Sequence, residues 1–394
     1  MSRLISVTLG EGSNLKAYLA IDSTVNDRCC GGVRISSDLS PHFLMEAART
    51  MTLKYGFVGL PVGGAKGGIA ADPEMPLERK QELLKNFGQA LKPLLKTYVP
   101  GAEMGTTDDD IRFMLTANGV RVQPGSQNIG LSGFYTGITV FAAAISAARY
   151  IGLDLKQASV AIEGFGNVGT STAQAFWENG IKVVAISTIR GAIYDESGLD
   201  VGELIKLYHR VGSQVVNLFP RGEKVERSRL PELDVDIFSP CAQPYSITSD
   251  NAGQVTARIV CPGANVPITA EAEPILLQRG ILSIPDFVAN CGGVLGISMK
   301  RSGLKEDYIT RFLTQKIGEQ VTKIIQAAEK ENIIPRVYAE RIAEERFLRV
   351  KAAAEKKDII SRTLNLALEL YRNGTIPYRL VTPIAPRYFE RRFR

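Results

Sequence analysis

The sequence contains one lysine whose surroundings suit acid–base chemistry. Lys66 lies in the run Gly63-Gly64-Ala65-Lys66-Gly67-Gly68, whose glycines let a ligand and neighbouring backbone come close to the amine. Burial and a second ammonium at Lys54 would lower the pKa of Lys66, as a lysine base near neutral pH requires. The run is not a phosphate-binding P-loop, because glycine instead of Ser or Thr follows Lys66 and the upstream spacing fails.

A second motif predicts a dinucleotide site. The turn Gly164-Phe165-Gly166-Asn167-Val168-Gly169 lies between the strand-like run Val160–Glu163 and a helix that Gly180 ends, and the strand-like run Lys182–Ile186 follows. In such a βαβ unit the first glycine permits the tight turn, the second lets the backbone approach a pyrophosphate, and the third lets helix and strand pack closely. The helix N-terminus, at Asn167 and Val168, offers free N–H groups to phosphate.

The end of the second strand of this unit bears on the choice of cofactor. An acidic residue there would bind the adenosine ribose of NAD, but the stretch reads Ser187-Thr188-Ile189-Arg190. Arg190 either neutralises the 2′-phosphate of NADP or is a solvated loop arginine. NAD and NADP both stay open, with a lean towards NADP.

Composition excludes several classes of protein. The 394 residues, 45% hydrophobic and 22% charged, predict a globular chain of two domains. The net charge of +6 is spread along the chain except for an arginine-rich tail, so we expect no nucleic-acid binding. The longest apolar run, 137–148, is shorter than the ~20 residues that cross a bilayer, which predicts a buried helix and no membrane association. Residues 1–11 lack the features of a secretory signal, so a cytoplasmic location is expected.

Cysteine and histidine usage argues against a metal site. The five cysteines show no paired CxxC spacing and fit a reducing compartment. The two histidines, His42 and His209, lie near no Ser, Cys or HExxH pattern. We therefore expect no metal ligand set, and hydrolase chemistry is disfavoured.

The elements that would position a lysine site lie in the first third of the chain. Residues 17–21 are strand-like, and Ser40 as N-cap with Pro41 at the first helical position begins a helix that Gly56 is expected to end. Spacings of three and four along this helix place Lys54 on the face that should be buried. Either Lys54 has a functional role, or its stem packs while its ammonium reaches water.

The rest of the chain continues the α/β pattern. Further strand-like runs complete a doubly wound sheet at 235–238, 258–261 and 281–284. After Asp286 the pattern is helical, with amphipathic segments at 305–330 and 336–357 that we expect to return to the first domain. For the arginine-rich tail, docking on a neighbouring subunit is favoured over nucleic-acid contact. The tail's aromatic residues are Tyr378, Tyr388, Phe389 and Phe393.

Taken together, these motifs resemble the glutamate, leucine, phenylalanine and valine dehydrogenase family, over roughly residues 15–350. The resemblance implies an N-terminal α/β substrate and oligomerisation domain (1–135, completed by about 335–394), a Rossmann NAD(P)-binding domain (136–334) and a homo-oligomer. The matching stretches are Gly31-Gly32-Val33-Arg34, Met51-Thr52-Leu53-Lys54, the Lys66 run, Gly105-Thr106-Thr107, Thr136-Gly137, the Gly164–Gly169 turn, Gly263-Ala264-Asn265 and Pro285-Asp286-Phe287-Val288-Ala289-Asn290-Cys291-Gly292-Gly293-Val294.

The resemblance also implies a reaction. In the family the residues matching Lys54 and Asn290 hold the substrate α-carboxylate, and the lysine matching Lys66 assists catalysis. Keeping both carboxylate holders implies an L-α-amino acid, because buried polar groups left unpaired are costly. Thr136 and Asn265 match positions beside the nicotinamide. The implied reaction is reversible: hydride transfer from Cα, addition of water to the imine assisted by Lys66, and release of ammonia and a 2-oxo acid.

One catalytic position departs from the family. Where the family carries an aspartate two residues before the glycine matched by Gly105, this sequence has Glu103, one methylene longer. Acid–base chemistry through Glu103 requires the loop to retreat, because misplacement on the order of 1 Å costs about a hundredfold in rate. A homologue that binds nucleotide without turnover therefore stays open.

Two further departures concern the substrate side chain. Close to Gly32, which we count among the substrate-binding residues, Cys30 replaces the lysine of glutamate-specific members, and Ile297 replaces their serine. A glutamate carboxylate buried beside Cys30 and Ile297 would be unpaired, so we expect an apolar or aromatic amino acid as substrate. The alternative is a glutamate dehydrogenase whose side-chain contacts come from elsewhere.

Overall fold

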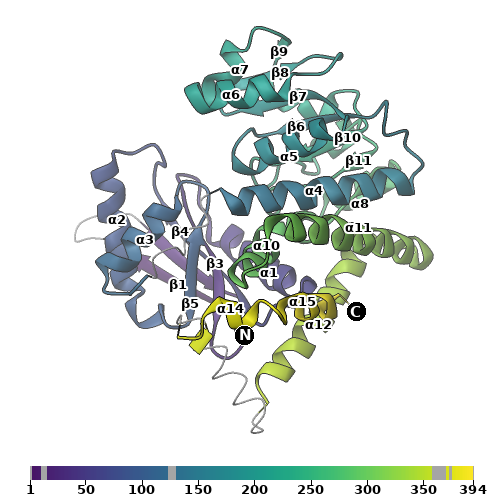
Figure 1. Cartoon of the computed structure of the whole chain (residues 1–394). Helices are drawn as coiled ribbons and strands as arrows, with labels where there is room; N and C mark the ends of the chain where they lie inside the picture. The colour runs from purple at the N-terminus through teal and green to yellow at the C-terminus, as the bar shows by residue number, and fades with distance from the viewer. Residues whose placement is uncertain (1, 10–15, 123–129, 357–369, 372–374, 394) are drawn as a thin grey trace. The chain divides into compact units, whose positions relative to one another are not determined.

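The computed structural model shows two compact units (Figure 1). The first unit comprises residues 1–129 and 342–383, and the second comprises residues 130–341 and 384–393. The chain thus leaves the first unit and returns to it, and residues 384–393 belong to the second unit. The structure describes residues 2–9, 16–122, 130–356, 370–371 and 375–393.

The first unit is built on a five-stranded mixed sheet. Its strands are β1 (Arg3–Thr8), β2 (Lys16–Ile21), β3 (Cys29–Ser36), β4 (Gly63–Ala70) and β5 (Tyr98–Ala102), in the order β1-β2-β4-β3-β5. β1, β2 and β4 are mutually antiparallel where they pair, whereas β3 runs parallel to both β4 and β5. The strand predicted at 17–21 is confirmed as β2. The helices before residue 118 are α1 (Pro41–Phe57), α2 (Leu77–Ala90) and α3 (Asp108–Ala117).

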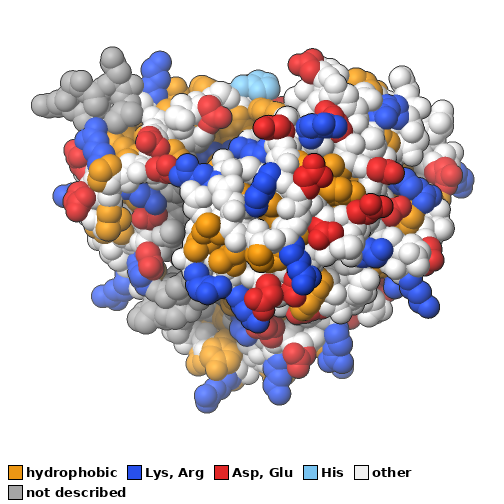
Figure 2. Space-filling model, turned by 90° about the horizontal axis from the view of Figure 1, so that it is seen from above, with side chains coloured by type: hydrophobic (Ala, Val, Ile, Leu, Met, Phe, Trp, Pro, Cys, Tyr) orange, Lys and Arg blue, Asp and Glu red, His pale blue; other side chains and the backbone are white. Residues whose placement is uncertain are grey.

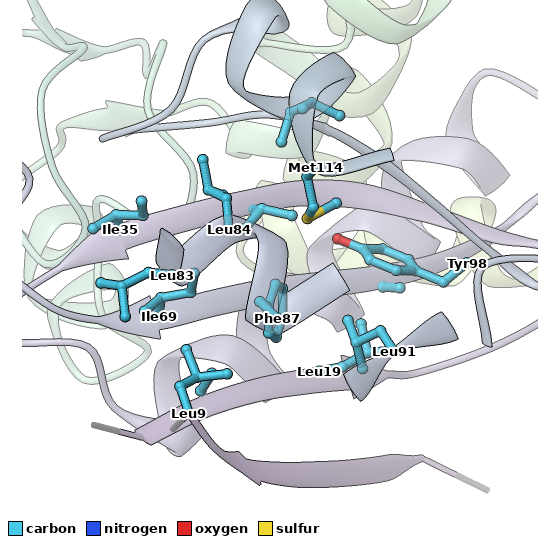
Figure 3. Close-up of a cluster of buried hydrophobic side chains, with 14 of the residues drawn as sticks. Leu9, Leu19, Ile35, Ile69, Leu83, Leu84, Phe87, Leu91, Tyr98 and Met114 are labelled. Atoms are coloured by element: carbon cyan, nitrogen blue, oxygen red, sulfur yellow. The ribbon is translucent and has the colours of Figure 1, made fainter. Parts of the chain in front are cut away.

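One face of this sheet forms the hydrophobic core of the first unit. Ile35 and Ile69 from the strands meet Phe87 of α2 and Met114 of α3 in a buried cluster (Figure 3). Tyr98, at the start of β5, is buried in the same cluster. The face occupied by α2 and α3 is therefore fully used for packing, and a ligand site on this sheet must lie on the other face.

Helix α1 begins where the sequence predicts. The Ser40 hydroxyl accepts a hydrogen bond from Phe43 N at 3.1 Å, and Pro41 is the first helical residue. The expectation that Gly56 ends the helix is wrong, because α1 continues to residue 57 and the glycine with positive φ is Gly59, at 67°. An ordinary helical φ/ψ at Gly56 leaves its lack of a side chain to be explained by packing.

That packing partner is α12 (Pro335–Ala354), whose residues from 342 onwards belong to the first unit. A Cβ at Gly56 would lie 2.2 Å from the carbonyl oxygen of Ala343. Arg346 donates from Nη1 to the carbonyl of Phe57 at 2.9 Å, which satisfies an acceptor at the end of α1. Gly56 therefore allows two helix backbones to approach closely.

The second unit is a doubly wound α/β domain, as predicted. Its sheet has the order β12-β11-β10-β6-β7-β8-β9, parallel from β12 to β7, with β8 and β9 added as antiparallel strands. Each of the five strands expected from the sequence has a counterpart shifted by at most two residues at its start; the antiparallel pair was not expected. The strands are β6 (Ser159–Glu163), β7 (Lys182–Thr188), β8 (Gly191–Tyr194), β9 (Glu223–Val225), β10 (Ile237–Pro240), β11 (Ile259–Val260) and β12 (Leu282–Ser283).

A central apolar helix, α4 (Leu131–Tyr150), packs against several helices of this unit. By length and composition it is the one described helix that could cross a membrane, and 67% of its apolar window is buried. The segment expected at 305–330 forms α11 (Glu306–Glu331), but it stays in the second unit instead of returning to the first. A Cβ at Gly318 of α11 would lie 2.6 Å from Ser146 Oγ, so α11 packs tightly on α4. Other helices are α5 (Asn167–Glu178), α6 (Val201–Val211), α8 (Ala272–Gln278), α9 (Asp286–Ala289) and α10 (Gly292–Arg301).

Part of the tail packs within the second unit. Helix α15 (Ala385–Arg392) packs on α11 of its own chain, where the rings of Phe393 and Phe312 lie 5.9 Å apart and Phe389 is 1% exposed. Phe389 and Phe393 therefore pack within the chain, and docking of the rest of the tail on a neighbouring subunit stays a prediction. Lys and Arg side chains are interspersed with Asp and Glu over the face drawn in Figure 2, so the net positive charge is not gathered there.

Candidate active site

The candidate catalytic residues share the sheet face opposite the α2–α3 core. The register pairs Cys30 with Gly64 and Arg34 with Gly68, which places Lys66 between the two pairs. Because side chains alternate along a strand, Cys30, Arg34 and Lys66 project from the same face. Helix α1 covers part of that face at the glycine positions of β4: a Cβ at Gly64 would lie 2.3 Å from the backbone nitrogen of a residue in α1. The glycines therefore explain how helix α1 can lie so close to the lysine run.

Lys66, Glu103 and Arg34 form an ion-paired cluster. Nζ of Lys66 is hydrogen bonded to Oε2 of Glu103, and Nη2 of Arg34 lies 3.1 Å from Oε1. The side chains of Lys66 and Glu103 are 1% and 18% exposed. The guanidinium of Arg34 lies over the ring of Phe43 in α1, 4.4 Å from its centroid. One carboxylate is thus shared by two cations, so the cluster carries a positive charge whenever Lys66 is protonated.

The charges in this cluster shift one another's protonation. Burial lowers the pKa of Lys66 below its usual 10.5; Glu103 opposes this shift and Arg34 adds to it. The lowering was expected, and the cation that adds to it is Arg34 on the same sheet face; the contribution expected from Lys54 on α1 stays a prediction. Burial alone would raise the pKa of Glu103, yet Lys66 and Arg34 together hold it well below its usual range. Glu103 is therefore a carboxylate, and Lys66 loses its proton at a lower pH than a free lysine does.

The loop after β5 fixes the position of Glu103. Its backbone N–H donates to Thr106 Oγ1 at 2.9 Å, and that hydroxyl lies 2.8 Å from the carbonyl of Val33, to which it can donate. Gly105 has φ of 79° and a Cβ there would lie 2.3 Å from the carbonyl of a β3 residue. The extra methylene of Glu103 fits because a Cβ on Gly32 would lie 2.7 Å from Glu103 Cβ. The longer acid therefore reaches Lys66 over a glycine.

Lys54 and Cys30 lie in the same unit as this cluster. Lys54 is 5% exposed on α1, so the burial expected from its spacing along the helix is confirmed. Cys30 is half-buried on β3. Among the expected site residues, Lys54, Lys66, Glu103, Gly32 and Cys30 belong to the first unit, and the remaining ones belong to the second.

In the second unit the glycine turn at the end of β6 has the features that a pyrophosphate needs. Gly164 has φ of 90°, and a Cβ on Gly169 would lie 1.7 Å from the carbonyl oxygen of Gly164. A Cβ at Gly166 would meet no other atom within 4 Å among the described residues, so this glycine faces open space. Helix α5 begins at Asn167, and the amides of its first turn, including that of Val168, have no acceptor within the helix. The turn therefore fits a dinucleotide phosphate.

The end of β7 offers less to a cofactor than its sequence suggests. Ser187 is 1% exposed and its hydroxyl accepts a hydrogen bond from Gly164 N at 2.9 Å. Thr188 is 7% exposed and donates to the carbonyl of Ser213 at 2.7 Å. Both hydroxyls thus support the backbone of the site. Arg190 is exposed, which leaves it as the group of this stretch that can reach a ligand.

Asn290 organises the loop that follows β11. Its side-chain amide lies 3.2 Å from the carbonyl of Gly263, 2.9 Å from that of Ala264 and 3.1 Å from Oδ1 of Asn265. Its own Oδ1 is buried without a hydrogen-bond partner in the described part of the chain. A buried acceptor of this kind is expected to have a partner in the liganded protein.

Thr136 and Ile297 lie on helices α4 and α10 of the second unit. Thr136 is 7% exposed on α4 and its hydroxyl donates to the carbonyl of Ser132 at 2.8 Å. A Cβ on Gly293 would lie 2.9 Å from that hydroxyl, which explains a glycine there. Ile297 is half-buried on α10. No group of three or more His, Cys, Asp or Glu side chains that could hold a metal ion occurs within the described ranges.

Arg34 is the cluster member to which the sequence argument gave no role. Arg34 is two residues from Gly32 in β3, and alternation along the strand places both on one face. Its pairing with Glu103 required the register of β3 and β5, which the sequence does not supply.

Comparison with known proteins points to one family. Its catalytic-domain model, described as Glutamate/Leucine/Phenylalanine/Valine dehydrogenase, matches residues 132–357, and the Glu/Leu/Phe/Val dehydrogenase dimerisation domain matches residues 3–118. An NAD-specific glutamate dehydrogenase of Staphylococcus aureus is 36% identical over 278 residues, 67% of this chain and 66% of that protein. An NADP-specific glutamate dehydrogenase of Saccharolobus shibatae is 33% identical over 317 residues, 75% and 74% of the two chains.

A solved structure shows the same fold. The hetero-hexameric glutamate dehydrogenase of Thermus thermophilus, in a Leu-bound form, superposes with a TM-score of 0.76 at 24% identity, covering 89% of this chain and 88% of that one. At this identity the likeness concerns the fold alone, and it agrees with the two-unit α/β architecture described above.

Proposed function

The chain belongs to the Glutamate/Leucine/Phenylalanine/Valine dehydrogenase family and is an NAD(P)-dependent amino acid dehydrogenase, and we propose that its substrates are L-α-amino acids with apolar or aromatic side chains. The observation that carries the proposal is the ion-paired cluster. Both Arg34 and Lys66, which share a sheet face with Cys30, are already paired with Glu103.

The overall reaction sets what the protein groups must do. An L-amino acid, water and the oxidised cofactor give a 2-oxo acid, ammonium, the reduced cofactor and one proton. When bound, the nicotinamide accepts a hydride from Cα of the substrate. The residues of the chain supply binding, orientation and proton transfer around that step.

Lys66 and Glu103 are suited to the proton transfers. A lysine of lowered pKa can accept a proton from the water that adds to the imine carbon. The ionised Oε2 of Glu103, bonded to Lys66 Nζ, holds that amine in place, and the proton that Lys66 has accepted can pass from Nζ to the departing nitrogen. The contact between the two groups argues against a homologue that binds nucleotide without turnover, since the extra methylene does not prevent Glu103 from reaching Lys66.

The amino-acid head group is assigned by the resemblance to Lys54 and Asn290. Both are buried, at 5% and 3% exposure. The positive charge of the Lys66–Arg34–Glu103 cluster favours an anionic carboxylate in the same way, because it leaves a cation unneutralised when Lys66 is protonated. These assignments to head-group binding remain part of the proposal.

The side-chain preference depends on the surroundings of Cys30. A side-chain carboxylate on this face would compete with Glu103 for Arg34 or remain unpaired, and an unpaired buried charge costs several kcal/mol, or about a hundredfold or more in kcat/KM. An apolar side chain avoids this cost.

Glutamate is the second candidate substrate, because the relatives named above are glutamate dehydrogenases. In addition, Nε of Arg34 is buried without a hydrogen-bond partner among the described residues. Were Glu103 to move, Arg34 could bind a side-chain carboxylate.

A substrate screen separates the two candidates. The purified chain would be assayed at 340 nm with both cofactors and equal concentrations of L-leucine, L-phenylalanine, L-tryptophan and L-glutamate. We expect kcat/KM for at least one apolar or aromatic substrate to exceed that for glutamate by about a hundredfold. In Cys30→Lys, glutamate should gain and the apolar substrates should lose; Cys30→Ser, which adds no charge, is the matched control. Glutamate as the best substrate of the wild type would refute the proposed preference.

A further inference from the structure

A strained residue follows the loop that Asn290 holds. Val266 has φ of 53°, in the left-handed region. A β-branched side chain is a genuine outlier there, and such strain persists only where the surroundings enforce it. The sequence therefore places valine where glycine would fold at lower cost, and the structure must hold it.

A buried aspartate is hydrogen bonded to the strained residue. Asp286, at the start of α9, is 0% exposed, and its Oδ2 accepts a hydrogen bond from Val266 N at 2.8 Å. The carbonyl of Val266 accepts from Tyr245 N at 2.9 Å. Both hydrogen-bonding groups of the strained peptide are thus engaged.

Asp286 is itself held by α12. Its Oδ1 accepts from Nη2 of Arg336 at 3.0 Å, and Nε of Arg336 donates to Oε1 of Glu273 at 2.8 Å. The second oxygen of Glu273 accepts from the Ser283 hydroxyl at 2.7 Å. Each carboxylate oxygen of Asp286 therefore accepts one hydrogen bond. An asparagine in this position would offer one oxygen and one NH2 group, so it could not accept both bonds.

Val266 adjoins two groups of the second unit that we assign to ligand binding, the Asn290 side chain and the Gly164–Gly169 turn. Residues 263–265 accept from the Asn290 side chain, and Asn290 N donates to the carbonyl of Asp286 at 2.8 Å. A Cβ on Gly263 would lie 2.8 Å from Cγ1 of Val168 at the start of α5, so the loop also packs on the glycine turn. A change in the backbone conformation of Val266 would therefore displace groups that contact both Asn290 and that turn.

We infer that Asp286, fixed by Arg336, is a positioning residue: it holds Val266 in its left-handed conformation and thereby sets the 263–265 loop and the Asn290 amide for the reacting groups. The inference rests on the proposed function of this site. It differs from a purely structural ion pair, because it couples Asp286 to the backbone strain at Val266.

The test is a double-mutant cycle between Asp286→Asn and Val266→Gly in the full chain. Asparagine has one oxygen for two donors, so Asp286→Asn should lower kcat/KM by about a hundredfold, the effect of a displacement near 1 Å. Glycine adopts positive φ without enforcement. Val266→Gly alone should change kcat/KM by less than about threefold, and in its background Asp286→Asn should cost less than about tenfold.

Controls separate positioning from stability. Arg341 lies on α12, the helix that also carries Arg336, and forms an exposed ion pair with Glu331. Arg341→Gln breaks this pair and should leave kcat/KM unchanged. Arg336→Lys keeps the positive charge but cannot donate to Asp286 and Glu273 at once as the guanidinium does, so it should lower kcat/KM by part of the Asp286→Asn effect. This variant serves as the test if Asp286→Asn does not fold. Hydrogen exchange of the amides at 263–266, measured by mass spectrometry, should speed up in Asp286→Asn and does not depend on activity.

Two results would overturn the inference. One is Asp286→Asn that unfolds at a lower temperature but keeps kcat/KM within about twofold; the other is a loss of equal size in the Val266→Gly background. A wild type that turns over no amino acid would instead refute the proposed function, and the hydrogen-exchange comparison would still judge Asp286.

Discussion

Placing at position 103 the aspartate that the family resemblance implies tests whether the Glu103 carboxylate is the one that serves Lys66. Glu103→Asp withdraws the carboxylate by about one C–C bond, ~1.5 Å. The 3.1 Å contact with Arg34 Nη2 would then exceed hydrogen-bond range, and the bond to Lys66 would be lost as well. The loop cannot follow easily, because Thr106 ties Glu103 N to the carbonyl of Val33.

The expected loss follows from this displacement. A misplacement of 1 Å costs about a hundredfold, so we expect kcat of Glu103→Asp to fall by about a hundredfold or more, roughly 2.7 kcal/mol in the activation free energy. The loss should appear in kcat more than in KM, because the carboxylate acts on the reacting atoms. The assay is NAD(P)H formation at 340 nm over the full concentration range of the best substrate.

A matched control removes the effect of the substitution type. Glu82→Asp shortens an exposed acid in the same unit, where Glu82 pairs with Arg79 at 2.7 Å, and should leave kcat unchanged. Activity of Glu103→Asp equal to or above the wild type would refute the reasoning, since it would show that the shorter acid serves Lys66 as well as Glu103 does.

Three further predictions concern the same unit. The wild-type kcat/KM should rise with pH and level off below pH 10.5, because Lys66 loses its proton at a lowered pKa. In Glu103→Gln this rise should move to lower pH, because Glu103 no longer raises the pKa of Lys66. A rise that stays at the same pH would contradict the assignment of Lys66 as the base. Glu103→Gln should lower the free energy of unfolding by about 3 kcal/mol near neutral pH, measured by urea unfolding. This difference should shrink as pH falls below 4.5 towards the lowered pKa of Glu103, because the wild type then also loses the carboxylate charge. A difference that is constant with pH would argue against the ion-paired role of Glu103. Gly56→Ala should lower the free energy of unfolding by about 1–3 kcal/mol, because a Cβ 2.2 Å from the Ala343 carbonyl oxygen costs more than the helix-propensity gain of roughly 1 kcal/mol. An unchanged urea midpoint would show that α12 can shift to make room for the methyl group.

Local patterns accounted for much of the fold, because they depend on neighbours in the chain. The Ser40-Pro41 start of α1 and the glycine turn after β6 were readable from turn chemistry and periodicity. The interior position of Gly56 was not, because the residue that excludes a side chain there, Ala343, lies far away in the sequence. Contacts of that range are set by tertiary packing.

The candidate site shows the same division. The glycines around Lys66 indicated a close approach, but the charge that acts on Lys66 comes from Arg34 and Glu103, on strands whose pairing the sequence left open. The strain at Val266 was equally out of reach, since a valine in that stretch gives no sign of positive φ. Register and backbone conformation are therefore what the structure adds.

The two departures from the family, at Glu103 and Cys30, act in the same direction once the register is known. Arg34 and Cys30 project from one face of β3, and Glu103 reaches over Gly32 to pair with both Arg34 and Lys66. Cys30 removes, by the resemblance, the lysine that would bind a glutamate side chain, and Glu103 occupies the cations that could replace it.

This coupling makes a prediction that neither departure makes alone. Cys30→Lys should raise kcat/KM for glutamate relative to an apolar substrate, and the ratio should rise further in Cys30→Lys with Glu103→Asp, because the shorter acid releases Arg34 for a side-chain carboxylate. Comparing ratios of kcat/KM cancels the general loss of rate from Glu103→Asp. Ratios that are simply additive would mean that the two positions act independently, and that Arg34 takes no part in selecting the side chain.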